Sequence, residues 1–190
     1  MAAGFAVLWR YKSTPADQER PPSRWPAESR LTLSPDRPTL LVFAHPHCPC
    51  TQATISEMGR LLARIPDRVS TYVLMVEPPG VPAKWADTGL WQRAAALPGV
   101  TLWRDEGARE AGRFRAQASG LTVLYDSAGR RLFSGGITAS RGHEGDSFGR
   151  RRLLALVDGR PADRDDSPVF GCTLGAHGSP PIQTEALRTQ

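Results

Sequence analysis

The stretch PTLLVFAHPHCPCTQAT, residues 38–54, joins a continuous apolar run to two histidines and two cysteines. A short apolar run without polar alternation is typical of a strand that is buried on both faces. After the cysteines, apolar residues recur at three- and four-residue spacing, which predicts a helix with one apolar face. These residues are Ile55, Met58, Leu61, Leu62 and Ile65. The sequence therefore predicts that the cysteines lie where a buried strand, 38–45, leads into a helix.

Strand and helix patterns alternate along the chain as far as residue 159. Strands are predicted over 69–78 and 99–105, helices over 88–97 and 106–116, a hairpin over 121–126 and 130–137, and a closing helix over 146–159. Asp146 or Ser147 is expected to cap the last helix, and Gly159 to end it. Alternating units build a parallel sheet covered by helices, to which the hairpin adds two antiparallel strands.

The segments that flank residues 38–159 differ in composition from this predicted domain. Residues 1–12 begin with nine apolar residues, MAAGFAVLW, whereas a membrane helix needs about twenty. This segment resembles the last third of a membrane anchor, although a flexible apolar terminus or a short helix on the domain is an equal alternative. Residues 13–37 hold five prolines, which predicts a tether or an irregular arm lying on the domain. Residues 160–190 are expected to form a poorly ordered tail, apart from the apolar cluster PVFGC, 168–172.

Composition narrows the classes of function. The chain has 190 residues, 40% of them hydrophobic and 23% charged, values close to those of soluble globular proteins. The net charge is +5, but the arginines are scattered among acidic residues and no aromatic-interleaved basic motif accompanies them. Nucleic-acid binding is therefore not expected. Three cysteines are too few for a disulfide scaffold in a chain of this length.

Two motifs together resemble a known superfamily. A strand ending in F-x-x-x-x-C (Phe43 to Cys48) that leads into a helix, and a later hairpin LYDSAGRRLFSGG (124–136), resemble the thioredoxin fold. The chain is most similar to membrane-tethered thioredoxin-like reductases and to peroxiredoxins. Within that superfamily, FAHPHCPC, FSGGITASRGHEGD and PVFGC resemble a group labelled RedB-like. The resemblance implies an α/β, thioredoxin-like fold over residues 38–159, with a central mixed sheet and helices on both faces.

The chain departs from the superfamily pattern at two places. Its cysteines, Cys48 and Cys50, are separated by one residue, whereas thioredoxins have two residues between theirs. If Cys48 matches the first cysteine of the family, Thr51 takes the place of the second; if Cys50 matches the second, His47 takes the place of the first. The family also places a cis-proline before the strand at 121–126, where this chain has Ala-Ser-Gly-Leu. The absence of that proline makes metal binding a competing interpretation.

The leading interpretation assigns thiol chemistry to Cys48. Unpaired N–H groups and the helix dipole at a helix N-terminus both favour a thiolate, and Pro49 suits the first helical turn. Cys48 is then the nucleophile, and either Cys50 or Cys172 is the resolving thiol. A disulfide between Cys48 and Cys50 would close a small, strained ring. A flexible tail would let Cys172 reach the site at modest entropic cost.

The competing interpretation is a metal site. His45 and His47 lie two residues apart, so they point the same way if the strand geometry continues that far. With Cys48 and Cys50 they offer imidazole and thiolate ligands, a mixture that suits copper or zinc. The spacing is too compressed for all four to bind one ion, but two or three of them, together with Cys172, could do so. Alternatively, each histidine holds the corner through a hydrogen bond, or tunes the pKa of a thiol.

Topology adds three further candidates. The second strand of the hairpin runs toward the cysteine end of the sheet, so the loop that follows it, 138–146, is expected there. Arg141 would stabilise a thiolate or an anionic substrate, His143 would transfer a proton, and Glu144 would orient His143. The alternative is a glycine-rich loop that carries exposed charges.

The sequence thus supports three functions. The first is a thiol–disulfide oxidoreductase or thiol peroxidase-like protein that acts through Cys48 on a thiol or disulfide protein or on a peroxide, with an electron donor of unknown identity and no resident cofactor. The second is a copper-, mercury- or zinc-binding protein or chaperone. The third is a non-catalytic binding module with a thioredoxin-like fold. We expect an extracytoplasmic (periplasmic) domain, associated with the membrane through residues 1–12.

Overall fold

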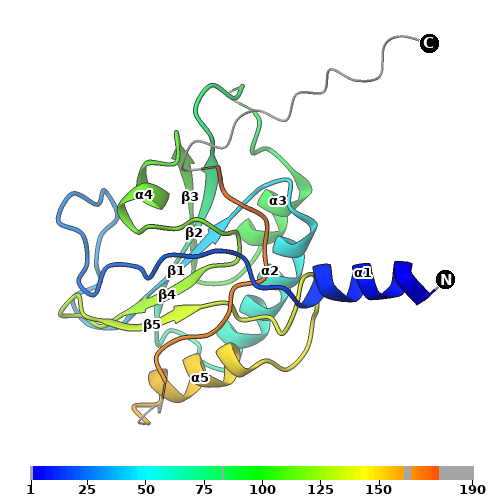
Figure 1. Ribbon diagram of the computed structural model, residues 1–190. Coiled ribbons are helices and arrows are strands. Elements are labelled where there is room, and N and C mark those ends of the chain that lie inside the picture. The colour runs from blue at the N-terminus through cyan, green and yellow to red at the C-terminus, as the bar shows by residue number, and fades with distance from the viewer. Residues whose placement is uncertain (1, 83, 161–163, 176–190) are drawn as a thin grey trace.

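The structure is a computed structural model that describes residues 2–82, 84–160 and 164–175. A five-stranded sheet with the order β3-β2-β1-β4-β5 forms its centre (Figure 1). β1 pairs in parallel with β2, and β2 with β3, whereas β4 is antiparallel to both β1 and β5. The strands are β1 Thr39–Ala44, β2 Ser70–Glu77, β3 Val100–Glu106, β4 Thr122–Tyr125 and β5 Arg131–Gly135.

Helices cover both faces of this sheet. α2 (Pro49–Leu62), α3 (Gly89–Ala95) and α5 (Phe148–Val157) enclose one apolar core, and α4 (Arg109–Arg113) helps to enclose the other. The sequence predicted a thioredoxin-like fold with a central mixed sheet and helices on both faces. That fold class is confirmed by the strand order, the strand directions and the helix placement.

The central strand β1 and the helix α2 position the cysteines. All six residues of β1 are buried, as the continuous apolar run predicted for a strand covered on both faces. α2 begins at Pro49, with Cys48 as its N-cap, and buries Ile55, Met58 and Leu61 against the sheet. The junction of β1 and α2 therefore lies at the carboxyl end of the central strand.

The helix α4 is shorter than the helix predicted over 106–116. Gly107 and Ala108 have φ angles of +67° and +54°, and Arg115 has a φ angle of +53°. Left-handed residues do not continue a right-handed helix, so the helical segment is confined to the residues between them. In α5, Ser147 rather than Asp146 caps the helix, because its side chain accepts a hydrogen bond from the backbone N–H of Arg150.

The proline-rich segment 13–37 lies on the domain as an irregular arm, which is one of the two arrangements predicted for it. The Trp25 ring contacts Phe114 and Tyr125 edge to face, with centroids 5.1 and 5.3 Å apart. The Tyr125 hydroxyl donates a hydrogen bond to the carbonyl of Pro22 at 2.9 Å. The arm therefore completes the core on the α4 face of the sheet.

The chain after α5 differs from the predicted tail. Residues 164–175 fold back along the domain (orange in Figure 1) and bury Val169 and Leu174. Gly136 makes room for them: a Cβ atom there would lie 2.6 Å from the carbonyl oxygen of Pro168. The tail was therefore wrongly predicted to be poorly ordered at 164–167 and 173–175, whereas the cluster 168–172 had been excepted; 161–163 and 176–190 lie outside the described residues.

The N-terminal helix α1, Ala2–Ser13, extends away from the rest of the domain (Figure 1). Its residues Val7, Leu8, Trp9 and Tyr11 have 58 to 69% of their surface exposed. Within the part of the chain that the structure describes, no helix is both long and apolar enough to span a bilayer. The predicted membrane association through residues 1–12 stays a prediction.

Candidate functional site

The three cysteines of the chain meet at the N-terminus of α2. The Sγ atoms of Cys48 and Cys172 are 2.8 Å apart, although the two residues are 124 positions apart in the sequence. All three Sγ atoms, including that of Cys50, lie within 4.8 Å of one another. The predicted nucleophile and both predicted resolving thiols therefore share one site.

Cys172 is positioned by a short antiparallel pairing between the C-terminal segment and the residues before β4. The N–H of Ser119 donates to the carbonyl of Cys172, and the N–H of Leu174 donates to the carbonyl of Gln117, each at 2.8 Å. A Cβ atom at Gly171 would lie 1.7 Å from the carbonyl oxygen of Ser119. Residue 171 must be glycine for the two backbones to approach this closely, and their approach brings Cys172 to Cys48.

Two buried hydroxyls, which the sequence analysis did not include among the site residues, hold the corner beneath the cysteines. The Ser119 hydroxyl oxygen accepts a hydrogen bond from the N–H of His45 at 2.9 Å and lies 2.6 Å from the Thr51 hydroxyl. Thr51 also hydrogen-bonds to the sulfur of Cys48. Sequence signals existed for both: Thr51 takes the place of a second cysteine in one register, and Ser119 lies in the segment where the family has its proline.

The surroundings of Cys48 favour its thiolate. Burial acts against the charged form, since Cys48 is only 4% exposed. Hydrogen bonds from the thiol and backbone N–H of Cys172 and from the hydroxyl and N–H of Thr51 outweigh burial and lower the pKa of Cys48. The lowered pKa therefore belongs to Cys48, the thiol at the N-terminus of α2, where the sequence analysis expected a thiolate to be favoured.

The other two thiols are held in their neutral form. Burial, the hydrogen bond with Cys48 and the charge of Cys48 raise the pKa of Cys172 to about 12. Burial and the charge of Cys48 also raise the pKa of Cys50, against the opposing charge of Arg141. The site thus favours the thiolate at Cys48 over a thiolate at Cys50 or Cys172, and the latter two remain thiols that can give hydrogen bonds or protons.

Arg141 reaches the site, as the topology of the hairpin predicted. Its guanidinium hydrogen-bonds to Cys50 and to the carbonyl of Gly171, and it lies 5.0 Å from the centroid of the Tyr11 ring. An open cavity of about 410 Å³ adjoins Cys50 and is lined by Tyr11, Lys12 and Arg141 among others. This cavity gives the cysteine cluster a route to solvent that is bordered by two positive charges.

The two histidines of the motif hydrogen-bond to backbone groups. His45 accepts a hydrogen bond at Nδ1 from the N–H of His47, and the Nε2 of His47 lies 2.8 Å from the carbonyl oxygen of Trp85. Burial lowers the pKa of His45, and the charge of His47 lowers it further. Among the described residues, the cysteine cluster is the one group of three or more His, Cys, Asp or Glu side chains close enough to share an ion. The predicted Cys–His ligand set is not brought together.

His143 and Glu144 do not contact the cysteines either. His143 is exposed at the tip of its loop. Glu144 lines the same cavity as Cys50 but pairs with Arg60 at 3.0 Å. The loop does lie on the cysteine side of the sheet, where Arg141 alone of the three candidates reaches a thiol. The roles predicted for His143 and Glu144 stay predictions.

A buried carboxylate ties this loop to the helices. Glu57, on α2, is fully buried and pairs with Arg60 and with Arg150 of α5. It also accepts a hydrogen bond from the N–H of Gly145 at 2.7 Å. Glu57 thereby holds the loop that carries Arg141 against the start of α5.

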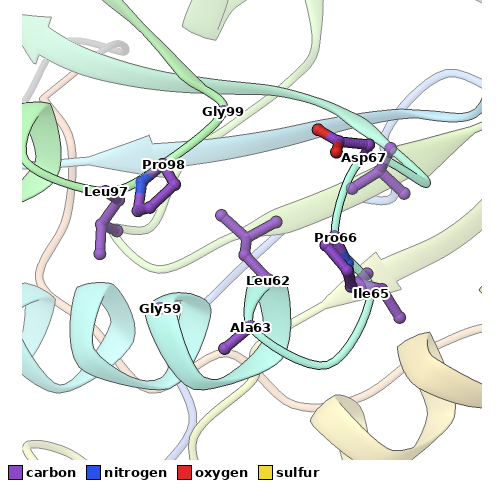
Figure 2. A pocket seen from close by; sticks show the side chains of 10 residues that line it. Gly59, Leu62, Ala63, Ile65, Pro66, Asp67, Leu97, Pro98 and Gly99 are labelled. Carbon is purple, nitrogen blue, oxygen red and sulfur yellow. The ribbon is translucent and has the colours of Figure 1, made fainter.

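A second cavity lies at the other end of α2. It has a volume of about 300 Å³ and is lined mainly by apolar residues of the α2 C-terminus, the turn after it and the α3–β3 loop (Figure 2). Leu62, Pro66 and Leu97 are among these residues. Because Cys48 lies at the opposite end of the helix, this cavity does not belong to the cysteine site.

Comparison with known proteins supports the fold but does not identify the reaction that the protein catalyses. No family model matches the sequence, and no curated protein matches it. Among solved structures, the chain is similar to an uncharacterized conserved protein from Geobacillus kaustophilus, with a TM-score of 0.61 and 19% identity over 85% of this chain and 92% of that one. It is also similar to a hypothetical protein from Sinorhizobium meliloti, with a TM-score of 0.60 and 14% identity over 85% and 94% of the two chains.

A third solved structure has a stated activity but matches less of the chain. It is a secreted disulfide oxidoreductase from Mycobacterium tuberculosis, which has a TM-score of 0.46 and 15% identity over 65% of this chain and 82% of that one. At such identities a likeness concerns the fold alone. The function of this chain must therefore be argued from its own cysteines.

Proposed function

We propose that the protein is a thiol–disulfide oxidoreductase in which Cys48 and Cys172 form the redox pair. The observation that carries the proposal is the 2.8 Å separation of their Sγ atoms at the N-terminus of α2. Two thiols this close need only a small movement to form a bond of about 2.05 Å. The lowered pKa of Cys48 supports its role as the attacking thiolate.

The exchange proceeds in two balanced steps. The Cys48 thiolate attacks one sulfur of a substrate disulfide, forms a mixed disulfide with it, and releases the other substrate sulfur as a thiolate. Cys172 then loses its proton and attacks the sulfur of Cys48, which releases the second substrate thiolate. The substrate disulfide is reduced to two thiols, and the protein is oxidised to a Cys48–Cys172 disulfide. The reverse sequence oxidises a substrate dithiol.

Substrate access requires the C-terminal segment to move. Cys48 is 4% exposed and its Sγ atom lies 2.8 Å from that of Cys172, so we expect an external disulfide to contact the thiolate only after this segment shifts. Near the site the segment is held by two backbone hydrogen bonds, by the Arg141 guanidinium on the Gly171 carbonyl and by the buried Leu174 side chain, so these contacts must loosen locally. The cavity beside Cys50 and Arg141 provides the approach. The charges of Lys12 and Arg141 on its lining, against the one of Glu144, favour substrates with acidic groups near the reactive sulfur.

Disulfide mapping tests the proposal. The reduced protein is treated with glutathione disulfide or with hydrogen peroxide, the remaining thiols are alkylated, and the pairs are identified by mass spectrometry. We expect Cys48–Cys172 as the main pair in the unmodified protein and in Cys50→Ser, and its loss in Cys172→Ser. Insulin reduction should fall with Cys172→Ser. A dominant Cys48–Cys50 pair would overturn the assignment, and failure to exchange with either oxidant would favour a non-catalytic binding module.

We also propose that the domain is extracytoplasmic and associated with the membrane, and that the chain belongs to the RedB-like group. The exposed apolar side chains of α1 support the first part, as does the persistence of disulfides in oxidising compartments. The motifs quoted from the sequence support the second. Cell fractionation of the full chain and of a variant lacking residues 1–12 tests the location. Equal release of both into the soluble cytoplasmic fraction would contradict it.

A further inference from the structure

The proposed redox pair leaves one thiol of the cluster without a role. Cys50 lies one residue beyond Pro49 in the first turn of α2, and its Sγ atom is within 4.8 Å of those of both Cys48 and Cys172. A disulfide needs two sulfurs, so the third sulfur is not explained by thiol–disulfide exchange. Three thiols from two distant segments converge on one small volume, which is the donor set of a soft metal site.

We propose that the reduced protein binds one copper(I) ion through the Sγ atoms of Cys48, Cys50 and Cys172. Of the ligand sets that the sequence left open, this is the one that contains all three cysteines and neither histidine. It requires three reduced cysteines and does not depend on any redox activity of the protein.

The positions of the sulfurs fit a three-coordinate ion. For metal–thiolate bonds of about 2.3 Å, an ion in the plane of three sulfurs places them about 4 Å apart. The Sγ atoms of Cys48 and Cys172 are 2.8 Å apart, and the largest separation in the cluster is below 4.8 Å. Binding therefore requires Cys172 to move back by about 1 Å, which is within the reach of a side-chain adjustment.

The number of ligands favours copper(I) over zinc. Thiolates prefer soft ions, and both copper(I) and zinc accept them, but structural zinc sites are almost always four-coordinate. Among the residues that the structure describes, no His, Asp or Glu side chain joins the three thiols as a fourth ligand. The Nδ1 of His45 instead accepts a hydrogen bond from the N–H of His47, and the Nε2 of His47 lies against the carbonyl of Trp85. Copper(I) forms stable three-coordinate complexes with thiolates, so it needs no fourth ligand.

The charge of the site is also suited to such a complex. Three thiolates around copper(I) carry a net charge of −2, which costs free energy unless positive groups lie nearby. The guanidinium of Arg141 hydrogen-bonds to Cys50, and Lys12 borders the same cavity. The cluster lies at the N-terminus of α2, where the helix dipole adds partial positive charge.

The metal site and the disulfide exclude each other. When Cys48 and Cys172 form a disulfide, the two thiolates give two electrons to an oxidant such as glutathione disulfide, and copper(I) loses two of its three ligands. The ion then leaves without changing its oxidation state. Oxidation of the protein therefore releases the metal, and a bound ion protects the thiols from oxidation.

Anaerobic titration of the fully reduced, full-length protein with copper(I), in competition with bicinchoninate, tests the proposal. We expect one ion per chain, and X-ray absorption showing three sulfur neighbours at the copper. Cys50→Ser and Cys172→Ser should each weaken binding by about 100-fold or more, since even residues that only support a ligand contribute about 10- to 100-fold. His47→Gln, which keeps a donor for the Trp85 carbonyl, should leave the affinity unchanged.

Several outcomes would contradict the proposed copper site. A nitrogen neighbour at the copper, or a loss of affinity in His47→Gln, would return the histidines to the ligand set. Two sulfur neighbours, or tighter binding of zinc than of copper(I), would reject the three-thiolate copper site. Because X-ray absorption is measured on the unmodified protein, a variant that misfolds does not affect this result. Copper binding without disulfide exchange would refute the proposed function alone, and exchange without copper binding would refute this inference alone.

Discussion

At the scale of single residues, the reactivity of Cys48 depends on two opposing effects. Burial disfavours its negative charge, whereas hydrogen bonds from Cys172 and Thr51 favour it. The bonds prevail because the sulfur is buried against donors rather than against hydrocarbon. The same bond from Cys172 to Cys48 helps to raise the pKa of Cys172, so the two sulfurs are driven toward opposite protonation states. This difference in pKa suits a redox pair in which Cys48 attacks the substrate as a thiolate and Cys172 stays protonated until it resolves the mixed disulfide.

The contribution of Thr51 can be measured by removing its hydroxyl. In a Cys50→Ser/Cys172→Ser background, where Cys48 is the one titrating thiol, Thr51→Val should raise the pKa of Cys48, because the thiolate loses a donor while the neutral thiol loses little. The titration of thiolate absorbance near 240 nm should therefore move to higher pH. Thr54→Val, the same change one turn further along α2, is the control. A midpoint that is unchanged or lower in Thr51→Val would show that the hydroxyl does not bind the sulfur.

At the scale of elements, local patterns predicted the helix–strand framework better than the site built on it. The junction of β1 and α2 follows from hydrophobic periodicity in adjacent residues, so Cys48 was placed correctly. The histidines were expected to point the same way along a strand, but β1 ends at Ala44, and Pro46 turns the chain between them. The order of residues 164–175 was also not predictable, because it depends on close backbone approach at glycines rather than on a local repeat.

Gly171 determines how closely the C-terminal segment approaches the residues before β4. Gly171→Ala places a methyl group against the Ser119 carbonyl, where the Cβ separation would be 1.7 Å, so the C-terminal segment must move away. We expect less Cys48–Cys172 disulfide at a fixed ratio of reduced to oxidised glutathione, and faster alkylation of Cys48 in the reduced protein. Gly112→Ala, where a Cβ atom meets nothing within 4 Å, is the control. If Gly171→Ala formed the disulfide as readily as the unmodified protein, the antiparallel pairing would not be what positions Cys172.

Glu57 connects three elements through buried charge. The Glu57→Ala variant leaves Arg150 without its buried partner, and the Arg150 side chain is only 13% exposed. Breaking a buried ion pair in this way lowers the free energy of unfolding by about 3–5 kcal/mol. Urea denaturation should show this loss as a lower midpoint. Glu144→Gln removes only a partly exposed ion pair with Arg60 and should change stability little. Equal midpoints for the two variants would mean that the buried network contributes nothing to the fold.

At the scale of the whole molecule, the proline-rich arm 13–37 and the C-terminal segment 164–175 contact each other. The N–H of Ala16 in the arm donates to the carbonyl of Val169 in the C-terminal segment at 2.8 Å, and Arg20 pairs with Asp166 at 3.2 Å. Such contacts join segments that are far apart in sequence and that carry no helical or strand period. They explain why the sequence predicted the sheet and its helices but left open how the arm lies and how Cys172 reaches the site.

Oxidation should stabilise the whole molecule. A Cys48–Cys172 disulfide links residues 124 positions apart, and closing a loop of this length restricts the unfolded chain by about 5 kcal/mol in the chain-entropy model. Little of this gain is lost to distortion, because the sulfurs already lie next to each other in the folded state. In a Cys50→Ser background, where no other pair forms, the oxidised protein should unfold at a higher guanidinium chloride concentration than the reduced protein. The double variant Cys50→Ser/Cys172→Ser should unfold at the same guanidinium chloride concentration in oxidising and in reducing buffer. A midpoint that falls on oxidation would mean that the folded structure resists the bond, and would count against Cys172 as the resolving thiol.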